Sequence, residues 1–255
     1  DGVEPDRGER DWHWGGNSTA DLAASMSSFQ VLDEVVAALE AAYPALERVV
    51  VAGHSAGGQI TMRYALFSRL EAPRLRLEYF VANPSSVTYL NASRPTLPPQ
   101  TCGSCVNATI AKTTYAFAAP PPDGRCADYD AYGYGLSGPL PDYPAATGRR
   151  RALENYGKRA VFYVSGAADV CDAKLMKRER CVACEPDDGG LDTSCEAYAQ
   201  GWCRMERLHA FAQFVRLFYD DDDVHSLVSV PNVGHSGCGI FQSPEFARAA
   251  RLVPH

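Results

Sequence analysis

One stretch of the sequence, from Arg48 to Gly58, constrains the fold more than any other. A short run rich in valine ends at Gly53, and the pattern Gly-x-Ser-x-Gly follows as Gly53-His54-Ser55-Ala56-Gly57. From Gln59 to Leu70, apolar residues recur at close to the period of a helix. The stretch therefore predicts a strand, a sharp turn and a helix, with Ser55 in the turn. The glycines are needed because the backbone at the serine is strained and the strand passes close to the helix.

This arrangement suits a nucleophilic serine. The turn lifts the hydroxyl of Ser55 above the edge of the sheet. The helix begins at the serine, so its first N–H groups and its dipole face any negative charge that develops there. The stretch therefore favours an alkoxide or a tetrahedral oxyanion at this place. The alternative interpretation is a glycine-rich turn that happens to contain a serine.

The rest of the chain alternates helices and strands. Apolar runs predict further strands at residues 77–82, 158–165 and 226–230, and helical periodicity predicts helices at 28–43, 205–219 and 244–252. This order predicts an α/β fold with a mostly parallel sheet and helices on both of its faces. In the helix at 28–43 we expect one apolar face formed by Phe29, Val31, Leu32, Val35, Val36, Leu39 and Ala42. In the helix at 205–219 we expect the apolar residues to point mostly inward: Leu208, Phe211, Ala212, Val215, Leu217 and Phe218.

Residues 87–156 do not continue this alternation of helices and strands, and they contain many Pro, Gly and Tyr residues. Irregular segments of this length inside a compact domain are usually functional, so we expect a cap or lid-like insertion within a single domain that spans 1–255. The tyrosine-rich part, residues 115–143, predicts a partly apolar pocket lined by aromatic side chains.

Three residue types suited to acyl transfer each come just after a predicted strand: Ser55, Asp169 and His235. Because the carboxyl ends of neighbouring parallel strands meet in one crevice, we expect these side chains to converge. His235 would take the proton of Ser55, and Asp169 would hold the other ring N–H of the histidine and stabilise the imidazolium. Asp172 is the rival for the acid. His54, next to the serine, is expected to bind substrate or line its pocket.

These motifs resemble those of the α/β-hydrolase superfamily, in which the chain order is also serine, acid, histidine. More narrowly, the chain resembles a group of little-characterised, exported hydrolases of bacteria and fungi in three segments: Val50–Gln59, Val81–Ser86 and Leu191–Gly201. The resemblance implies a serine hydrolase of the esterase or lipase type that cleaves a carboxylic ester through an acyl-enzyme. It also implies that the backbone N–H of Ala56 is one donor of the oxyanion hole, and it implies no cofactor.

One departure from the superfamily pattern concerns the first part of the chain. Members usually place three or four strands and a second oxyanion donor before the serine, whereas 54 residues precede Ser55 here. Trp14-Gly15-Gly16 resembles an oxyanion glycine motif but lies too close to the serine for the usual intervening elements. Either N-terminal strands are missing, with an upstream chain or segment completing the sheet, or the sheet is trimmed and has an unusual first edge. We favour the first, because the strand before Ser55 would otherwise lie at an exposed edge prone to aggregation. Two further alternatives stay open: a non-catalytic structural or binding subunit, and an acyltransferase or peptidase that uses the same three residues.

Composition limits the partners and the compartment. The net charge is −7 with a pI near 5.4, which argues against nucleic acid as a partner, and no apolar run is long enough to cross a membrane. The resemblance to the α/β-hydrolase superfamily implies a small-molecule or lipid ester as the substrate. Nine cysteines, with glycosylation sequons at Asn17, Asn91 and Asn107, predict a secreted or lumenal glycoprotein.

The cysteines are expected to form disulfides rather than a zinc site, although Cys102-x-x-Cys105 and Cys181-x-x-Cys184 leave zinc as an alternative. We expect no bound metal. Cys171 follows the acid and Cys238 follows the histidine, so a bridge between them would join the two loops. The other expected bridges join Cys126 to Cys102 or Cys105, and Cys195 to Cys203. An odd number of cysteines leaves one thiol free or paired outside the chain.

Overall fold

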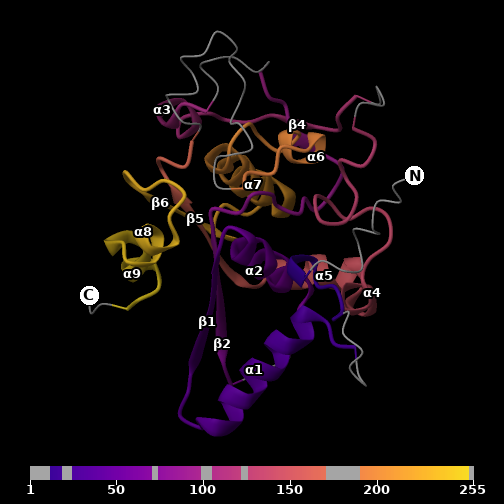
Figure 1. Cartoon of the computed structure of the whole chain (residues 1–255), viewed down its shortest axis with the longest axis vertical. Coiled ribbons are helices and arrows are strands. Elements are labelled where there is room, and N and C mark those ends of the chain that lie inside the picture. Colours follow the sequence, from indigo (N-terminus) through magenta and orange to yellow (C-terminus); the bar gives the residue numbers. More distant parts are fainter. Residues whose placement is uncertain are drawn as a thin grey trace.

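The computed structural model describes residues 12–18, 25–70, 74–98, 105–121, 126–170 and 190–252 (Figure 1). The elements follow in this order: η1 (Trp12–Trp14), α1 (Ser28–Ala42), β1 (Arg48–His54), α2 (Ala56–Phe67), β2 (Arg76–Ala82), β3 (Arg94–Pro95), α3 (Asn107–Ile110), β4 (Phe117–Ala118), α4 (Asp142–Thr147), α5 (Arg149–Tyr156), β5 (Ala160–Gly166), α6 (Cys195–Tyr198), α7 (Arg204–Tyr219), β6 (Ser226–Val230), α8 (Gly237–Phe241) and α9 (Pro244–Ala249).

The main sheet of the described residues has four strands in the order β1-β2-β5-β6, and every neighbouring pair is parallel. This confirms the four strands and the parallel sheet expected from the sequence. Because all four strands point the same way, their carboxyl ends meet at one edge of the sheet. Within the described part of the chain, β1 is an edge strand, and β2 pairs with it from Arg48↔Arg76 to His54↔Ala82.

Helices cover both faces of the sheet, as predicted. Alternate residues of a strand point to opposite faces, and β2 shows this clearly. Tyr79 and Val81 join the larger apolar cluster with residues of α2 and α7, whereas Phe80 and Ala82 join the smaller cluster with residues of α8 and α9. Figure 1 shows α8 and α9 beside β5 and β6, away from α2.

The expected buried face of the first helix is partly wrong. In α1, Phe29 and Val36 are buried, but Val31 and Val35 are 46% and 51% exposed. Residues seven positions apart lie on the same face of a helix, because seven residues make about two turns, so Phe29 and Val36 share a face. Val31 and Val35 lie on a different face of the helix. In α7, Leu217 is 66% exposed and not inward as expected. Both helices have a narrower buried face than their apolar residues suggest.

The stretch 87–156 contains more regular structure than its composition suggests. It holds the two-stranded antiparallel sheet β3–β4 and the helices α3, α4 and α5. Both α4 and α5 lie against α2, and Tyr143 and Tyr156 from these helices belong to the main apolar cluster. The last part of the stretch therefore contributes to the core beside α2.

The described cysteines pair differently from the expectation. The sulfur atoms of Cys126 and Cys195 are joined, whereas Cys105, Cys203 and Cys238 carry free thiols. Sequence spacing alone does not determine which cysteines meet, so the bridges expected for Cys126 to Cys102 or Cys105, and for Cys195 to Cys203, were wrong. The expected bridge to Cys238 is not formed here, and its other half, Cys171, lies outside the described residues, as does Cys102.

Among the helices described, none combines the length and the apolar character that a bilayer span requires.

Candidate active site

Ser55 occupies a strained turn between β1 and α2. Its φ angle is +59°, a region that non-glycine residues rarely adopt. A Cβ atom at position 53 would lie 2.0 Å from the carbonyl oxygen of Gly57, and one at position 58 would lie 2.6 Å from that of Ala82. Gly53 and Gly58 are therefore required by close backbone approaches. A Cβ at Gly57 would meet nothing within 4 Å, so the last glycine of the Gly-x-Ser-x-Gly pattern is not required by packing.

The three residues predicted for acyl transfer come together at the carboxyl edge of the sheet. The Oγ atom of Ser55 lies 3.1 Å from Nε2 of His235, and Nδ1 of His235 lies 2.9 Å from Oδ2 of Asp169. A carboxylate only accepts hydrogen bonds, so the hydrogen of the neutral imidazole is on Nδ1. Nε2 is then the acceptor for the hydroxyl of Ser55. The rival acid, Asp172, lies outside the described residues.

Asp169 is held in place through both its backbone and its carboxylate. Its backbone N–H donates to the carbonyl of Gly166 at 3.0 Å, which closes the turn after β5. The backbone N–H of Met205 donates to the carbonyl of Asp169 at 3.3 Å. The Nη1 atom of Arg204 lies 3.7 Å from Oδ1 of Asp169. The side chain of Arg204 is 2% exposed and that of Asp169 is 5% exposed. A buried carboxylate thus faces a guanidinium on one oxygen and a histidine on the other.

Asn83 connects the acid loop to the histidine loop. It follows β2, the strand between the serine strand and the acid strand. Its side-chain oxygen accepts from the N–H of Gly166 at 2.8 Å, and its Nδ2 donates to the carbonyl of Gly234 at 3.2 Å. One amide side chain therefore spans the ends of β5 and the loop after β6. Sequence reasoning missed both Asn83 and Arg204, although Asn83 also follows a predicted strand and this position was a usable signal.

His54 lies against the ring of His235. The ring centroids are 4.5 Å apart, and the planes are inclined by 39°. Burial, followed by the proximity of His235, lowers the pKa of His54 to about 4. His54 is therefore a neutral imidazole near pH 7 that packs on one side of the candidate base. The sequence placed it near the site, and its expected contact with substrate stays a prediction.

Backbone N–H groups at the start of α2 suit an oxyanion. Ala56 is the first residue of this helix, directly after the serine, and the first N–H groups of a helix have no partner within it. The Trp14-Gly15-Gly16 segment has different contacts. The carbonyl of Trp14 accepts from the hydroxyl of Tyr132 at 2.6 Å, and Gly15 packs on the ring of Phe29. The contacts of that segment are those of a packed core element.

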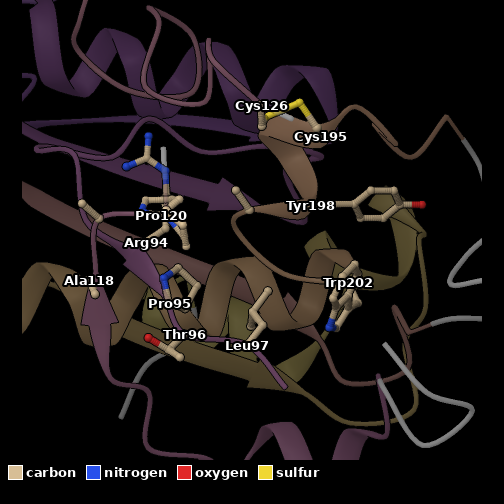
Figure 2. A pocket seen from close by; sticks show the side chains of 13 residues that line it. Arg94, Pro95, Thr96, Leu97, Ala118, Pro120, Cys126, Cys195, Tyr198 and Trp202 are labelled. Carbon is tan, nitrogen blue, oxygen red and sulfur yellow. A yellow bond between two sulfur atoms is a disulfide. The ribbon is translucent and has the colours of Figure 1, made fainter. Parts of the chain in front are cut away.

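A cavity of about 760 Å³ lies beside β3, β4 and α6 (Figure 2). Its wall is mostly apolar and includes Leu97, Pro120, Tyr198 and Trp202, together with the Cys126–Cys195 pair. The cavity wall contains none of the three residues predicted for acyl transfer. Its aromatic residues also lie outside the stretch 115–143 that was expected to supply them.

The tyrosines of residues 115–143 are mostly buried and hydrogen-bonded to other parts of the protein. Tyr115, Tyr132 and Tyr143 are at most 5% exposed. The hydroxyl of Tyr143 donates to Asp33, and that of Tyr134 donates to Asp192 at 2.7 Å. These tyrosines therefore anchor the segment to the rest of the protein, and the expectation that they line a pocket is wrong for this cavity.

Among the described residues, one group of side chains has potential metal-ligand atoms close together: Cys126, Cys195 and Glu196. Two of its three atoms are the sulfurs that are bonded to each other. A cysteine binds a metal as a thiolate, and these two sulfurs are joined to each other, so this group is a structural bridge in the state described.

Comparison with known proteins identifies the fold family. The model of the Alpha/beta hydrolase family matches residues 5–250. A structure of poly(aspartic acid) hydrolase-1 from Sphingomonas sp. KT-1 has a TM-score of 0.48 and 19% sequence identity, with 85% of this chain and 61% of that chain covered. A poly(3-hydroxybutyrate) depolymerase from Bordetella parapertussis has a TM-score of 0.49 and 18% identity, with 89% of this chain and 61% of that chain covered.

The chain thus spans about three fifths of the length of these two structures. No curated protein matches the sequence.

Proposed function

The chain belongs to the α/β-hydrolase family, and we propose that it is a serine hydrolase that cleaves a carboxylic ester through an acyl-enzyme. The observation that carries the proposal is the continuous hydrogen-bonded series from Ser55 through His235 to Asp169, with links of 3.1 and 2.9 Å. This series supplies a nucleophile, a base and an orienting acid in one place.

In the first step, Oγ of Ser55 attacks the ester carbonyl carbon while Nε2 of His235 takes the hydroxyl proton. The resulting imidazolium keeps its Nδ1–H on Asp169, which stabilises the positive charge. The carbonyl oxygen becomes an oxyanion, and the N–H of Ala56 donates a hydrogen bond to it. His235 then gives its proton to the leaving alcohol, which departs and leaves the acyl group on Ser55.

In the second step, water enters and His235 acts again as the base. The water adds to the acyl carbon, the acid product departs and Ser55 regains its proton. His54 stays neutral beside the ring of His235, so it adds no positive charge that would oppose the formation of the imidazolium.

Hydrolysis of chromogenic p-nitrophenyl esters of increasing acyl length tests this function. We expect turnover by the parent chain, and a loss of at least about 10³-fold in kcat/KM in both Ser55→Ala and His235→Ala. Parallel assays with an amide substrate and with an alcohol as acyl acceptor distinguish a peptidase or an acyltransferase. A folded parent protein that is inactive in all three assays would contradict the proposal and favour the binding subunit.

We also propose that a further strand pairs with the free edge of β1. In the described residues β1 has a neighbour on one side only, and most of its residues are only partly buried. A sheet edge with free N–H and C=O groups readily accepts another strand. Hydrogen exchange in the natural full-length protein tests this. We expect slow exchange both at the β1 amides that face β2 and at those that face away from it. Fast exchange at the amides that face away from β2 would contradict the proposal.

The proposed location is the secretory pathway or the extracellular space. The joined Cys126 and Cys195 support an oxidising compartment. Of the sequon asparagines, Asn91 is exposed, whereas the side chain of Asn17 donates to Asp142 at 2.9 Å. We therefore expect Asn91 to carry a glycan in a eukaryotic secretory host, and the absence of any mass change on glycosidase treatment would contradict this.

A further inference from the structure

Two buried thiols meet where the 87–156 segment contacts the start of α7. Cys105 and Cys203 are 3% and 1% exposed. They belong to one apolar cluster with Ile110, Leu191 and Met205, and α3 lies against α7 at the same place. The two cysteines are far apart in sequence, so this contact is created by the fold.

The side chains of Cys105 and Cys203 interact within this cluster. The side chain of Cys203 is hydrogen-bonded to Cys105, and this contact, followed by burial, raises the pKa of Cys105. The cavity beside α6 is bordered by Trp202, next to Cys203, and by the joined Cys126 and Cys195. A second cysteine contact thus lies close to an existing bridge.

The existing bridge shows a pattern that the second contact repeats. Cys126 comes from the 87–156 segment and is joined to Cys195 at the first residue of α6. Cys105 comes from the same segment and meets Cys203, which follows α6 and directly precedes α7. The segment therefore contacts both ends of the short stretch around α6 through a cysteine.

From these contacts we propose that Cys105 and Cys203 form a second disulfide when the chain folds in an oxidising environment. The oxidant is a small-molecule disulfide such as oxidised glutathione. One protein thiolate attacks it to form a mixed disulfide, and the second thiolate displaces the remaining glutathione. Two protein thiols and one oxidised glutathione give one protein disulfide and two reduced glutathiones, so the atoms and electrons balance.

Burial determines when this bridge forms. Enclosed thiols exchange slowly, because the attacking species is the thiolate and the reagent must reach it. The bridge therefore forms during folding, before the cluster closes, and the folded protein protects it from reductants. Its location has a structural consequence, because Cys203 is followed by Arg204, which faces Asp169. The bridge would fix the start of α7 beside the acid.

Thiol counting on the full chain tests the proposal. The protein is refolded in a mixture of reduced and oxidised glutathione, denatured without reductant and labelled with a maleimide. Neither Cys105 nor Cys203 is expected to be labelled in the parent protein. Cys105→Ser should release one new labelled thiol at Cys203, and Cys203→Ser should release one at Cys105. Cys238→Ser is the matched control, because its thiol is exposed and its loss should leave the labelling of the other two unchanged.

Cys102 is the cysteine closest to Cys105 in the sequence, and Cys102→Ser tests whether it, and not Cys105, pairs with Cys203. If Cys102→Ser, and not Cys105→Ser, exposes the thiol of Cys203, the proposed pairing is wrong. If both thiols are labelled in the refolded parent protein, the bridge does not form. Peptide mapping of the unreduced parent protein identifies the paired cysteines without any variant, so a substitution that prevents folding does not decide the outcome. The test does not depend on the proposed ester hydrolysis.

Discussion

The guanidinium of Arg204 lies 3.7 Å from Oδ1 of Asp169, the carboxylate oxygen that His235 does not use. Both side chains are almost fully buried. A buried carboxylate needs a compensating partner, and a nearby guanidinium offsets its charge and restricts its orientation. Arg204 is thus a positioning residue that acts on His235 through the acid.

Replacement of Arg204 should therefore impair turnover. Removing one partner of a buried ion pair costs about 3 to 5 kcal/mol. If about half of this loss falls on the transition state, Arg204→Met lowers kcat about 10- to 100-fold with little change in KM. Arg204→Lys keeps the charge and should recover part of the loss. Steady-state kinetics on one ester measures this, with Arg248→Met at the exposed pair with Glu245 as the control. Parental kcat in Arg204→Met would contradict the positioning role.

Asn83 is expected to matter through the two loops that it joins. Asn83→Asp keeps the acceptor for Gly166 but places an oxygen against the carbonyl of Gly234, where an N–H now donates. The repulsion should displace the histidine loop and reduce kcat by about tenfold or more. Asn155→Asp, in α5, is the control. Equal kcat in the two variants would show that the link does not position the site.

The glycines of the serine turn should differ in their tolerance of a side chain. Gly53→Ala places a methyl group 2.0 Å from a backbone oxygen, so we expect no folded protein or a melting temperature lower by more than about 10 °C. Gly57→Ala has open space around the new methyl and should change stability by about 1 kcal/mol at most. Thermal melting of both variants decides the question. A large loss in Gly57→Ala would contradict the packing described.

Stability should fall in acid because of buried histidines. Burial lowers the pKa values of His225 and His209 to about 4, whereas the unfolded chain titrates near 6.5. The unfolded state therefore takes up protons first, and the stabilisation present above about pH 6.5 is lost as the pH falls towards 4. In the folded state Nε2 of His225 donates to the carbonyl of Tyr156, and Nδ1 accepts from the hydroxyl of Tyr163.

His225→Gln should consequently reduce the pH dependence. It will lower the melting temperature at pH 7.5, because it disturbs the hydrogen bonds with Tyr156 and Tyr163. The further drop between pH 7.5 and pH 4.5 should be smaller than in the parent protein. Differential scanning calorimetry at the two pH values checks this, and an unchanged drop would show that His225 is not a cause of the acid sensitivity.

The sequence was sufficient to predict the strands, the turn at Ser55 and the meeting of Ser55, Asp169 and His235. These features depend on local patterns and on one rule, that parallel strands end at a common edge. Arg204 was not predictable in the same way, because its contact with Asp169 depends on where α7 begins relative to the acid loop. The link through Asn83 likewise depends on the packing of three loops.

The predictions from sequence that were wrong depend on which elements pack together in the fold. Val31 and Val35 are apolar but exposed in α1, since a helical face is buried only where another element packs against it. The tyrosines of 115–143 were assigned to a pocket, yet several of them are buried with hydrogen-bonded hydroxyls. The pairing of Cys126 with Cys195 joins segments that no sequence spacing relates.

Labelling with a fluorophosphonate is the most direct test of the central claim, that Ser55 is a nucleophile activated by His235. We predict a covalent adduct on the parent protein that maps to Ser55 by mass spectrometry. It should be absent in Ser55→Ala and should form at least about 10³-fold more slowly in His235→Ala. A folded parent protein that remains unlabelled, or an adduct on another serine, would contradict this claim.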